Sequence, residues 1–176
     1  GLPALRTLVS DFDAVLWSVF FLVPVGRGRV LDPISPERAD DVMSWLGTVT
    51  EQEDFAIKTT EAPHYRRVMA QESNDGAKRR GGVIAGDGFA FVSHTGEMYP
   101  SGFLPESVGN VKESDPVGLY RNSALFERLR DRDELEGKCG ACPFRSICGG
   151  SRSRADAYTG NTLVNEPLCP RVPEED

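Results

Sequence analysis

The apolar residues of the first seventy positions are spaced alternately as in strands and as in helices. Residues 15–23 are β-branched and aromatic, which predicts a strand, and residues 55–60 predict a second one. A helix is expected between them, over about 35–47, and another short helix begins within 64–69. Such a β-α-β order predicts a parallel sheet with a right-handed crossover, as in part of a β/α barrel. Two units of this kind cannot close a barrel alone.

The helix after the first strand has a clear start signal. Ser35 supplies a hydroxyl N-cap, and Pro36 occupies the first helical position. The apolar residues that follow recur at intervals of three and four, so one face of the helix is expected to pack on the sheet. These residues are Val42, Trp45, Leu46 and Val49. The helix is expected to end near Gly47.

The second half of the chain has a different order of elements. Residues 72–82 contain almost no apolar side chains and are interpreted as a linker. Apolar runs at 88–93 and 98–99 flank a glycine-containing turn, which predicts a β-hairpin. A helix is then expected from Ser123 to Gly137, with Gly137 as its C-cap. The predicted order is hairpin, helix and a cysteine-rich loop.

Composition is that of a globular, mildly acidic protein. Of 176 residues, 39% are hydrophobic and 27% charged, with a formal net charge of -7, so a nucleic-acid partner is not expected. The most apolar stretch, residues 14–25, is too short to span a bilayer and is interpreted as a strand buried on both faces. We expect a cytoplasmic protein without a membrane partner. A start at Gly1 without a targeting motif suggests a processed product or a piece of a longer chain.

Four cysteines are the strongest chemical signal. Cys139, Cys142 and Cys148 are spaced C-x2-C-x5-C in a loop rich in glycine and small residues, and Cys169 follows just before a proline. Glycines let the backbone curl around a bulky core, and four thiolates held together are the ligand set of a metal site. All four are therefore candidate metal ligands.

Three interpretations of these cysteines remain open on spacing alone. A structural zinc ribbon usually has two C-x2-C knuckles, and only the first half of this set has that form. Two disulfides suit smaller secreted chains that cannot bury a large core. A [4Fe-4S] cluster is commonly held by a compact three-cysteine loop and one remote cysteine.

Residues 89–101, Val108-Gly-Asn-Val111 and the cysteine pattern together resemble the SPASM domain of radical S-adenosylmethionine enzymes. The similarity covers about residues 82–171. Residues 21–28 and 57–66 resemble the late barrel strands of a subgroup close to the haem-biosynthesis members. The resemblance implies an α/β fold: residues 1–75 are a partial β/α barrel segment, and residues 82–171 a small α+β SPASM domain with a hairpin and a cluster loop.

Departures from the SPASM pattern concern the ligands of a second cluster. No cysteine occurs in residues 81–88, Ser101 stands after the Tyr-Pro of the second hairpin strand, and Arg152 stands at the fourth loop position. The resemblance therefore implies one auxiliary [4Fe-4S] cluster, held by Cys139, Cys142, Cys148 and Cys169. With one thiolate on each iron, the cluster has no open site for substrate, so electron transfer or fold stabilisation is its expected role.

The C-x3-C-x2-C loop that binds the catalytic cluster of such enzymes is absent. The chain is therefore expected to be inactive alone and to form the C-terminal portion of an enzyme. S-adenosylmethionine and a second cluster would belong to the N-terminal radical half. The expected substrate is a tetrapyrrole side chain, as in haem-type biosynthesis, or a ribosomal peptide, and an electron-donor protein is a further candidate partner. A zinc-binding module and a free-standing iron-sulfur electron carrier remain the alternatives.

A few other residues are candidates for the site. Arg27 follows a buried strand at the end of a parallel sheet, where ligands usually bind, so it is a candidate to meet a carboxylate of S-adenosylmethionine or substrate. Glu61 and His64 follow the second strand and are expected near the same pocket, although a structural, hydrogen-bonded role is the simpler interpretation of His64. Ser151 and Arg152 could donate hydrogen bonds to sulfur, but a solvated surface position is expected for both.

Overall fold

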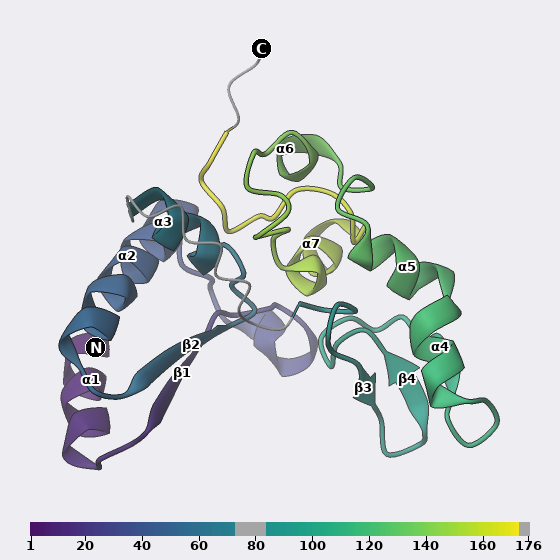
Figure 1. The fold of residues 1–176 in the computed structure, drawn as a ribbon, viewed down its shortest axis with the longest axis horizontal. Coiled ribbons are helices and arrows are strands. Elements are labelled where there is room, and N and C mark those ends of the chain that lie inside the picture. The colour runs from purple at the N-terminus through teal and green to yellow at the C-terminus, as the bar shows by residue number, and fades with distance from the viewer. Residues whose placement is uncertain (73–83, 173–176) are drawn as a thin grey trace.

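The computed structural model describes residues 1–72 and 84–172. Within these ranges the fold is mixed α/β, with helices and two small sheets, which confirms the expected class. Figure 1 shows two groups of elements side by side: α1, α2, α3, β1 and β2 form one, and β3, β4 and α4 to α7 form the other. Helix α7 lies on the side of its group that faces the N-terminal elements.

The N-terminal group contains a parallel pair of strands. Its elements are α1 (Leu2–Asp11), β1 (Leu16–Phe20), η1 (Gly26–Val30), α2 (Pro36–Gln52), β2 (Ala56–Thr60) and α3 (Tyr65–Glu72). Strands β1 and β2 pair in parallel from Leu16 opposite Ala56 to Phe20 opposite Thr60. The predicted strand-helix-strand order and the parallel pairing are confirmed. Helix α1 was not expected from the sequence.

Helix α2 begins as predicted but ends later. The Ser35 hydroxyl accepts a hydrogen bond from the backbone N–H of Arg38 at 3.2 Å, and Pro36 follows the cap. The helix runs through Gly47 to Gln52, so the expected end near Gly47 is wrong. A Cβ at position 47 would lie 2.8 Å from the Met69 sulfur of α3. The absence of a side chain at Gly47 therefore leaves room for Met69 of α3 against α2.

Strand β1 is buried on one face only. Trp17 and Val19 pack against the core, whereas Leu16 and Phe20 are about half exposed, at 50% and 48%. The expectation of a strand buried on both faces is therefore wrong, because in the described residues the face that carries Leu16 and Phe20 is only partly covered, by a contact of Phe20 with Phe103 at a ring-centre distance of 5.2 Å. None of the helices in the described ranges combines the length and apolarity that crossing a membrane requires.

The two groups share one hydrophobic core. Phe21, Met43, Leu46 and Val68 of the N-terminal group are each less than 5% exposed and pack together. Leu168, from the segment just before the last cysteine, joins the same cluster. Burial of a large aliphatic side chain stabilises a fold by about 1.5–3 kcal/mol. The C-terminal segment is thereby fixed against the N-terminal elements.

The C-terminal group begins with a small antiparallel sheet. Its elements are β3 (Phe91–Val92), β4 (Glu97–Tyr99), β5 (Gly109–Asn110), α4 (Pro116–Asn122), α5 (Ala124–Arg130), α6 (Gly137–Gly140) and α7 (Arg152–Thr159). Strands β3 and β4 pair antiparallel, which confirms the hairpin. Gly96 turns between them with φ +99°, a conformation that favours glycine. The predicted linker at 72–82 lies almost wholly outside the described residues.

The helix expected from Ser123 to Gly137 is shorter in the structure. Ser123 caps α5 as predicted, but the helix ends at Arg130. The Arg132 guanidinium turns back to bond the Leu129 carbonyl at 2.8 Å and pairs with Asp87 at 2.8 Å. It thus satisfies a terminal helix carbonyl, while its ion pair ties the helix end to the start of the sheet. Gly137 begins α6 instead of capping α5.

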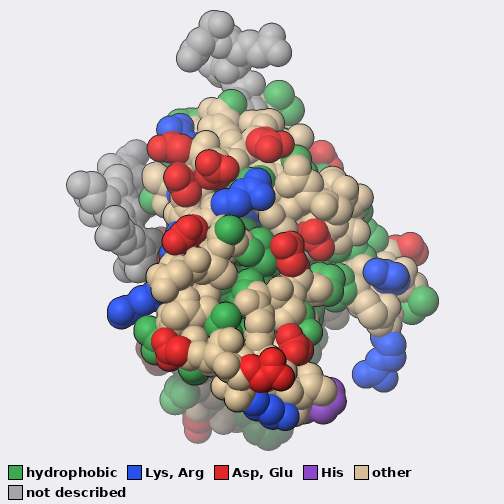
Figure 2. Space-filling view, turned by 90° about the vertical axis from the view of Figure 1, so that its right-hand side faces the viewer, with side chains coloured by type: hydrophobic (Ala, Val, Ile, Leu, Met, Phe, Trp, Pro, Cys, Tyr) green, Lys and Arg blue, Asp and Glu red, His purple; other side chains and the backbone are tan. Residues whose placement is uncertain are grey.

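Charged side chains are spread over the surface of the C-terminal group. Figure 2 shows acidic side chains distributed over this face, with hydrophobic ones between them. Lys and Arg side chains on the same face are scattered and form no stripe. The distribution agrees with the net charge of -7.

Candidate metal centre

The cysteine loop is shaped by short turns and two left-handed glycines. Cys139 lies in α6, and the Cys148 N–H bonds the Phe144 carbonyl at 2.9 Å in a further turn. Gly149 and Gly150 follow with φ +68° and +65°. A Cβ at Gly150 would meet the Arg152 guanidinium at 2.5 Å and the Cβ of Glu166 at 2.8 Å. Only glycine can therefore carry the backbone from Cys148 into α7 at this point.

All four cysteines line one pocket. Cys139, Cys142 and Cys148 come from the loop, and Cys169 comes from the segment near the C-terminus. The pocket holds about 390 Å³ of space not filled by protein atoms, part of it open to solvent. The four cysteines are free thiols and are not joined in disulfides. Remote Cys169 is thus brought to the loop as expected.

The sulfur atoms are not packed around a single point. In residues 1–72 and 84–172, no group of three or more His, Cys, Asp or Glu side chains is close enough to bind one metal ion. A zinc ion with four thiolates needs every sulfur about 2.3 Å from the same centre. A cube of iron and sulfide instead takes one thiolate at each of its irons, so its ligands stand around a larger core.

Hydrogen-bond donors point at three of the four sulfurs. The backbone N–H of Glu166 lies 3.2 Å from Cys139 Sγ, and that of Gly150 lies 3.4 Å from Cys148 Sγ. Guanidinium groups add two further contacts: Arg152 reaches Cys139 Sγ at 3.6 Å, and Arg67 reaches Cys169 Sγ at 3.8 Å. Donors of this kind stabilise negative charge on sulfur.

Burial raises the pKa of two of the metal-free thiols, Cys148 and Cys169. It raises the pKa of Cys148 to about 12, an effect that the Gly150 N–H only partly opposes. The pKa of Cys169 is also raised, again mainly by burial. A thiol must lose its proton to bind metal, so a metal cation has to displace the proton of each buried ligand thiol. Metal binding at this site is therefore coupled to proton release.

Helix α7 carries two buried arginines that reach to opposite sides. Arg152 is fully buried and bonds the carbonyls of Thr162 and Val164 at 2.8 Å each, besides the Cys139 sulfur. Ser151 is 2% exposed and caps α7. The expected surface position of Ser151 and Arg152 is wrong, because both side chains turn inward. Arg152 ties the cysteine loop to the segment before Cys169, and the Ser151 hydroxyl donates to Glu61.

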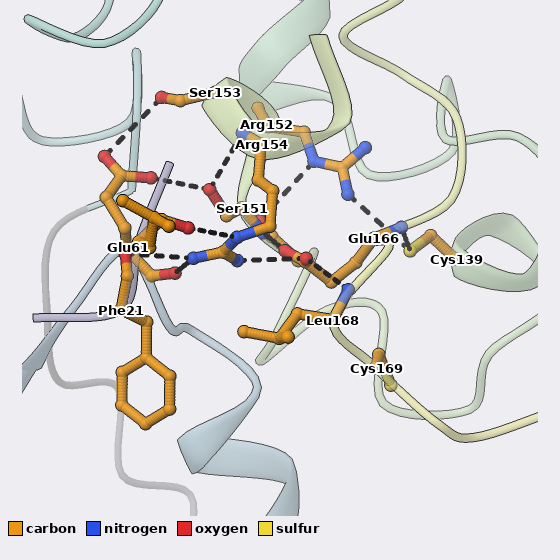
Figure 3. Close-up of polar contacts among 12 residues, drawn as sticks. Phe21, Glu61, Cys139, Ser151, Arg152, Ser153, Arg154, Glu166, Leu168 and Cys169 are labelled. Atoms are coloured by element: carbon orange, nitrogen blue, oxygen red, sulfur yellow. Dashed lines mark hydrogen bonds and ion pairs between the residues drawn. The ribbon is translucent and has the colours of Figure 1, made fainter. Parts of the chain in front are cut away.

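Arg154 joins the cysteine site to the ends of the parallel strands. Its guanidinium bonds the carbonyls of Phe21 at 3.1 Å, Leu22 at 2.9 Å and Glu61 at 2.7 Å, all just beyond β1 and β2. It also pairs with Glu166 at 2.9 Å, and both side chains are 1% exposed. Figure 3 shows this guanidinium between the strand ends on one side and Glu166 on the other.

Glu61 and Glu166 complete this network. Glu61 Oε2 accepts a hydrogen bond from the Ser151 hydroxyl at 2.6 Å. Glu166 accepts from the backbone N–H groups of Ser151 and Leu168 as well as from Arg154. Burial acts to raise the pKa of Glu166, but the Arg154 guanidinium and the Leu168 N–H lower it below its ordinary value. Glu166 is therefore a buried carboxylate with its partners in place.

His64 lies inside the pocket lining. Its side chain is fully buried just before α3, and neither ring nitrogen has a hydrogen-bond partner among the described residues. The simpler interpretation, a hydrogen-bonded structural histidine, is wrong about the hydrogen bond, which is not found among the described residues. Burial lowers the pKa of His64 to about 4, so its ring is neutral at pH 7.

Buried side-chain nitrogens without a partner gather at this pocket. In the part of the chain that the structure describes, they belong to three residues: His64, Arg67 through its Nε, and Arg171 through its Nε. All three line the cysteine pocket. Buried donors in native proteins are nearly always paired, so each such exception needs an explanation. Here the exceptions surround one space that is also lined by four thiols.

Arg27 lies elsewhere. It is exposed in η1 and is not among the residues that line the cysteine pocket. A second, larger hollow of about 840 Å³, part of it open to solvent, lies at the end of β1. Its lining is mostly apolar, with Phe20, Phe21 and Leu22, and Arg38 is its basic residue. The predicted role of Arg27 toward a carboxylate stays a prediction.

No direct signal in the sequence marked Arg67, Arg154 or Glu166 as residues of the site. All three lie outside the cysteine motif. All three are also charged, and charged residues are mostly exposed, so the sequence favours a surface position for them. One weak signal exists: Glu166 lies three residues before Cys169, and a carboxylate so close to a buried thiol needs a cationic partner. Arg154 is that partner.

No protein-family model matches the chain. Among curated proteins, an AdoMet-dependent heme synthase of Methanosarcina barkeri is 38% identical over 173 residues, covering 92% of this chain and 50% of that protein. A pre-heme d1 synthase of Dinoroseobacter shibae is 34% identical over 148 residues, covering 82% of this chain and 34% of that protein.

A PqqA peptide cyclase of Xanthomonas oryzae pv. oryzae is 30% identical over 93 residues, covering 50% of this chain and 25% of that protein. The chain spans about half the length of the heme synthase that it matches, and smaller shares of the other two. Over nearly all of its length, the chain is therefore homologous to one half of a protein named AdoMet-dependent heme synthase.

Proposed function

We propose that this chain is the C-terminal portion of a radical S-adenosylmethionine enzyme and that it binds one auxiliary [4Fe-4S] cluster. Residues 1–75 would supply the late units of the partial barrel, and residues 82–171 would form the SPASM domain. The similarity to AdoMet-dependent heme synthase and PqqA peptide cyclase supports this assignment. The central observation is the pocket that four cysteines from two distant segments line together.

The residues present fit such a cluster. Cys139, Cys142, Cys148 and Cys169 would each bind one iron, and backbone N–H groups already point at two of these sulfurs. Around them stand basic side chains, Arg67, Lys138, Arg145 and Arg171, which would offset the negative charge of a cluster with four thiolates. When bound, the cluster would supply one-electron chemistry and fold stabilisation.

The positions at which a second cluster would have ligands are taken up by other contacts. Ser101 is 4% exposed and donates a hydrogen bond to Glu61 Oε1 at 3.3 Å. The Arg152 guanidinium donates hydrogen bonds to the Cys139 sulfur and to loop carbonyls. Ser101 therefore links the C-terminal group to the N-terminal one, and Arg152 holds the cysteine loop within its own group. This supports one auxiliary cluster in place of two.

The place of the pocket also supports an enzymatic setting. Ligands of parallel α/β folds usually bind at the carboxyl ends of the strands. Arg154 bonds carbonyls just beyond β1 and β2, so α7 holds the cysteine site against that end of the sheet. The chain's own residues thus position the cluster beside the region where substrate would lie.

The uncovered apolar surface of the N-terminal group supports the presence of a further barrel half. Several large apolar side chains within the first 34 residues are at least 44% exposed. They are Leu5, Leu8, Phe12, Val15, Leu16, Phe20, Val30, Leu31 and Ile34. Exposed apolar surface of this extent marks an interaction site. The radical half, with S-adenosylmethionine and its own cluster, would cover this surface.

For the substrate we propose a tetrapyrrole side chain. The names of two relatives, AdoMet-dependent heme synthase and pre-heme d1 synthase, support this choice over a ribosomal peptide. The hollow at the end of β1 has a mostly apolar lining, with Asp32 and Arg38 as its charged residues, which suits a flat apolar ring. A ribosomal peptide would be the second substrate class, as the similarity to PqqA peptide cyclase indicates.

Anaerobic reconstitution with iron and sulfide tests the cluster assignment. The chain should turn brown and bind about four irons and four sulfides. Cys148→Ser should lose most of this iron, whereas Ser146→Ala, an exposed residue of the same loop, should bind as much as the unchanged chain. A colourless protein with one zinc per chain would show instead a zinc-binding module.

A further inference from the structure

His64 is held rigidly at the edge of the cysteine pocket. It follows Pro63 in the turn after β2, and its carbonyl accepts the first helical bond of α3, from the Val68 N–H at 3.1 Å. The ring packs edge-on against Phe21, with ring centres 6.2 Å apart. A fully buried ring fixed by a helix start and an aromatic neighbour has little freedom to seek a partner elsewhere.

The polar neighbours of His64 are already satisfied. Glu166, the acidic group with the largest electrostatic effect on His64, accepts hydrogen bonds from Arg154, from the Leu168 N–H and from the Ser151 N–H. Asp40, the other acidic neighbour, accepts two hydrogen bonds from Arg67, at 2.6 and 2.7 Å. Among the described residues, neither imidazole nitrogen has a hydrogen-bond partner.

An imidazole carries at least one N–H in either protonation state. Leaving that donor unpaired in a buried site costs about 1–3 kcal/mol. The same pocket contains the unpaired Nε groups of Arg67 and Arg171. Donors from three separate side chains around one space indicate that an acceptor-rich group fills it. Sulfide and thiolate sulfurs of a cluster are such acceptors.

Building on the proposed cluster, we propose that His64 donates an N–H hydrogen bond to one of its sulfur atoms and so positions the cluster and raises its reduction potential. The reduced cluster carries one more negative charge than the oxidised one. A donor to sulfur therefore stabilises the reduced state more. His64 is then a positioning residue of the cluster and not a metal ligand.

The chain has only two histidines, which makes a direct test practical. The chain is grown with ¹⁵N-histidine, reconstituted with iron and sulfide, and reduced with dithionite. Pulsed electron paramagnetic resonance should then show a weak coupling between the cluster and a histidine nitrogen. His94 is the matched control, because it is exposed in the turn between β3 and β4. The labelled wild-type chain gives a result even where a variant does not fold.

Variants test whether the nitrogen coupling and the reduction potential depend on His64. His64→Phe should abolish the coupling and shift the midpoint potential to a more negative value. His64→Gln, which keeps an N–H donor, should restore part of the shift. His94→Phe should change neither the coupling nor the potential.

The outcomes separate this inference from the proposed function. A chain that binds four irons and sulfides but shows no histidine coupling, or keeps the coupling in His64→Phe, overturns the role of His64 and leaves the cluster in place. A strong coupling of the size found for a directly bound imidazole also overturns it, in favour of ligation. A chain that binds no cluster at all overturns both proposals.

Discussion

Arg154 is expected to be the largest single contributor to the contact between the two groups of elements. Replacing it by methionine keeps a linear side chain of similar length but removes every donor. Glu166 then stays buried without its ion-pair partner, and three backbone carbonyls lose a hydrogen bond. Removal of one partner from a buried ion pair costs about 3–5 kcal/mol. The total stability of a domain is only about 5–15 kcal/mol, so this is a large fraction.

Urea unfolding of the metal-free chain, followed by far-ultraviolet circular dichroism, measures the loss. With an m-value of about 2 kcal/mol per molar urea, Arg154→Met should lower the midpoint by about 1.5–2.5 M. The double variant Arg154→Met/Glu166→Gln should recover part of the loss, because a neutral amide replaces the unpaired buried charge.

Arg38→Met is the matched control. Arg38 pairs with Asp41 at 3.8 Å, and both side chains are 69% exposed, so its loss should change stability by less than about 0.5 kcal/mol. A loss below about 1 kcal/mol for Arg154→Met, or a double variant no more stable than the single one, would refute the reasoning. The buried network would then not hold the halves together.

Three further predictions concern the cysteine site. The metal-free chain should lose stability as pH rises from about 9 to 12. The reason is that the unfolded state releases the proton of Cys148 near its ordinary pKa of 9.0, while the folded state retains it to about 12. In urea titrations at each pH, Cys148→Ala should lessen this loss, and an unchanged dependence of stability on pH would contradict the assignment. Gly150→Ala should lower the amount of iron bound on reconstitution, since its Cβ would meet Arg152 and Glu166. Gly88→Ala, whose Cβ would meet nothing within 4 Å, should bind iron normally. Equal iron in both variants would count against the packing argument. Incubated with S-adenosylmethionine and dithionite, the reconstituted chain should form no 5'-deoxyadenosine in chromatographic analysis, and its formation would show that the chain itself holds a catalytic cluster.

Short-range signals in the sequence predicted the local elements well. Ser35 and Pro36 marked the start of α2, and the glycine turn marked the β3-β4 hairpin, because caps and turns depend on neighbouring residues alone. Gly47 was misinterpreted as a helix end because its reason lies in Met69 of another helix. Only the three-dimensional structure brings these two residues together.

The same distinction holds for the candidate site. The four cysteines could be predicted from spacing, since residue type and interval carry the chemistry of a metal loop. Arg152 and Arg154 could not, because a charged residue in a polar segment is interpreted as solvated unless its buried partners are known. Those partners, Glu166 and the carbonyls at the ends of β1 and β2, come from distant parts of the chain.

Mössbauer spectroscopy of the chain reconstituted with ⁵⁷Fe addresses the ligand set directly. We expect the signature of a [4Fe-4S] cluster in which every iron carries a thiolate, with no iron of distinct coordination. Isolated iron ions, an iron that lacks a sulfur ligand, or no bound iron would contradict a cluster held by Cys139, Cys142, Cys148 and Cys169.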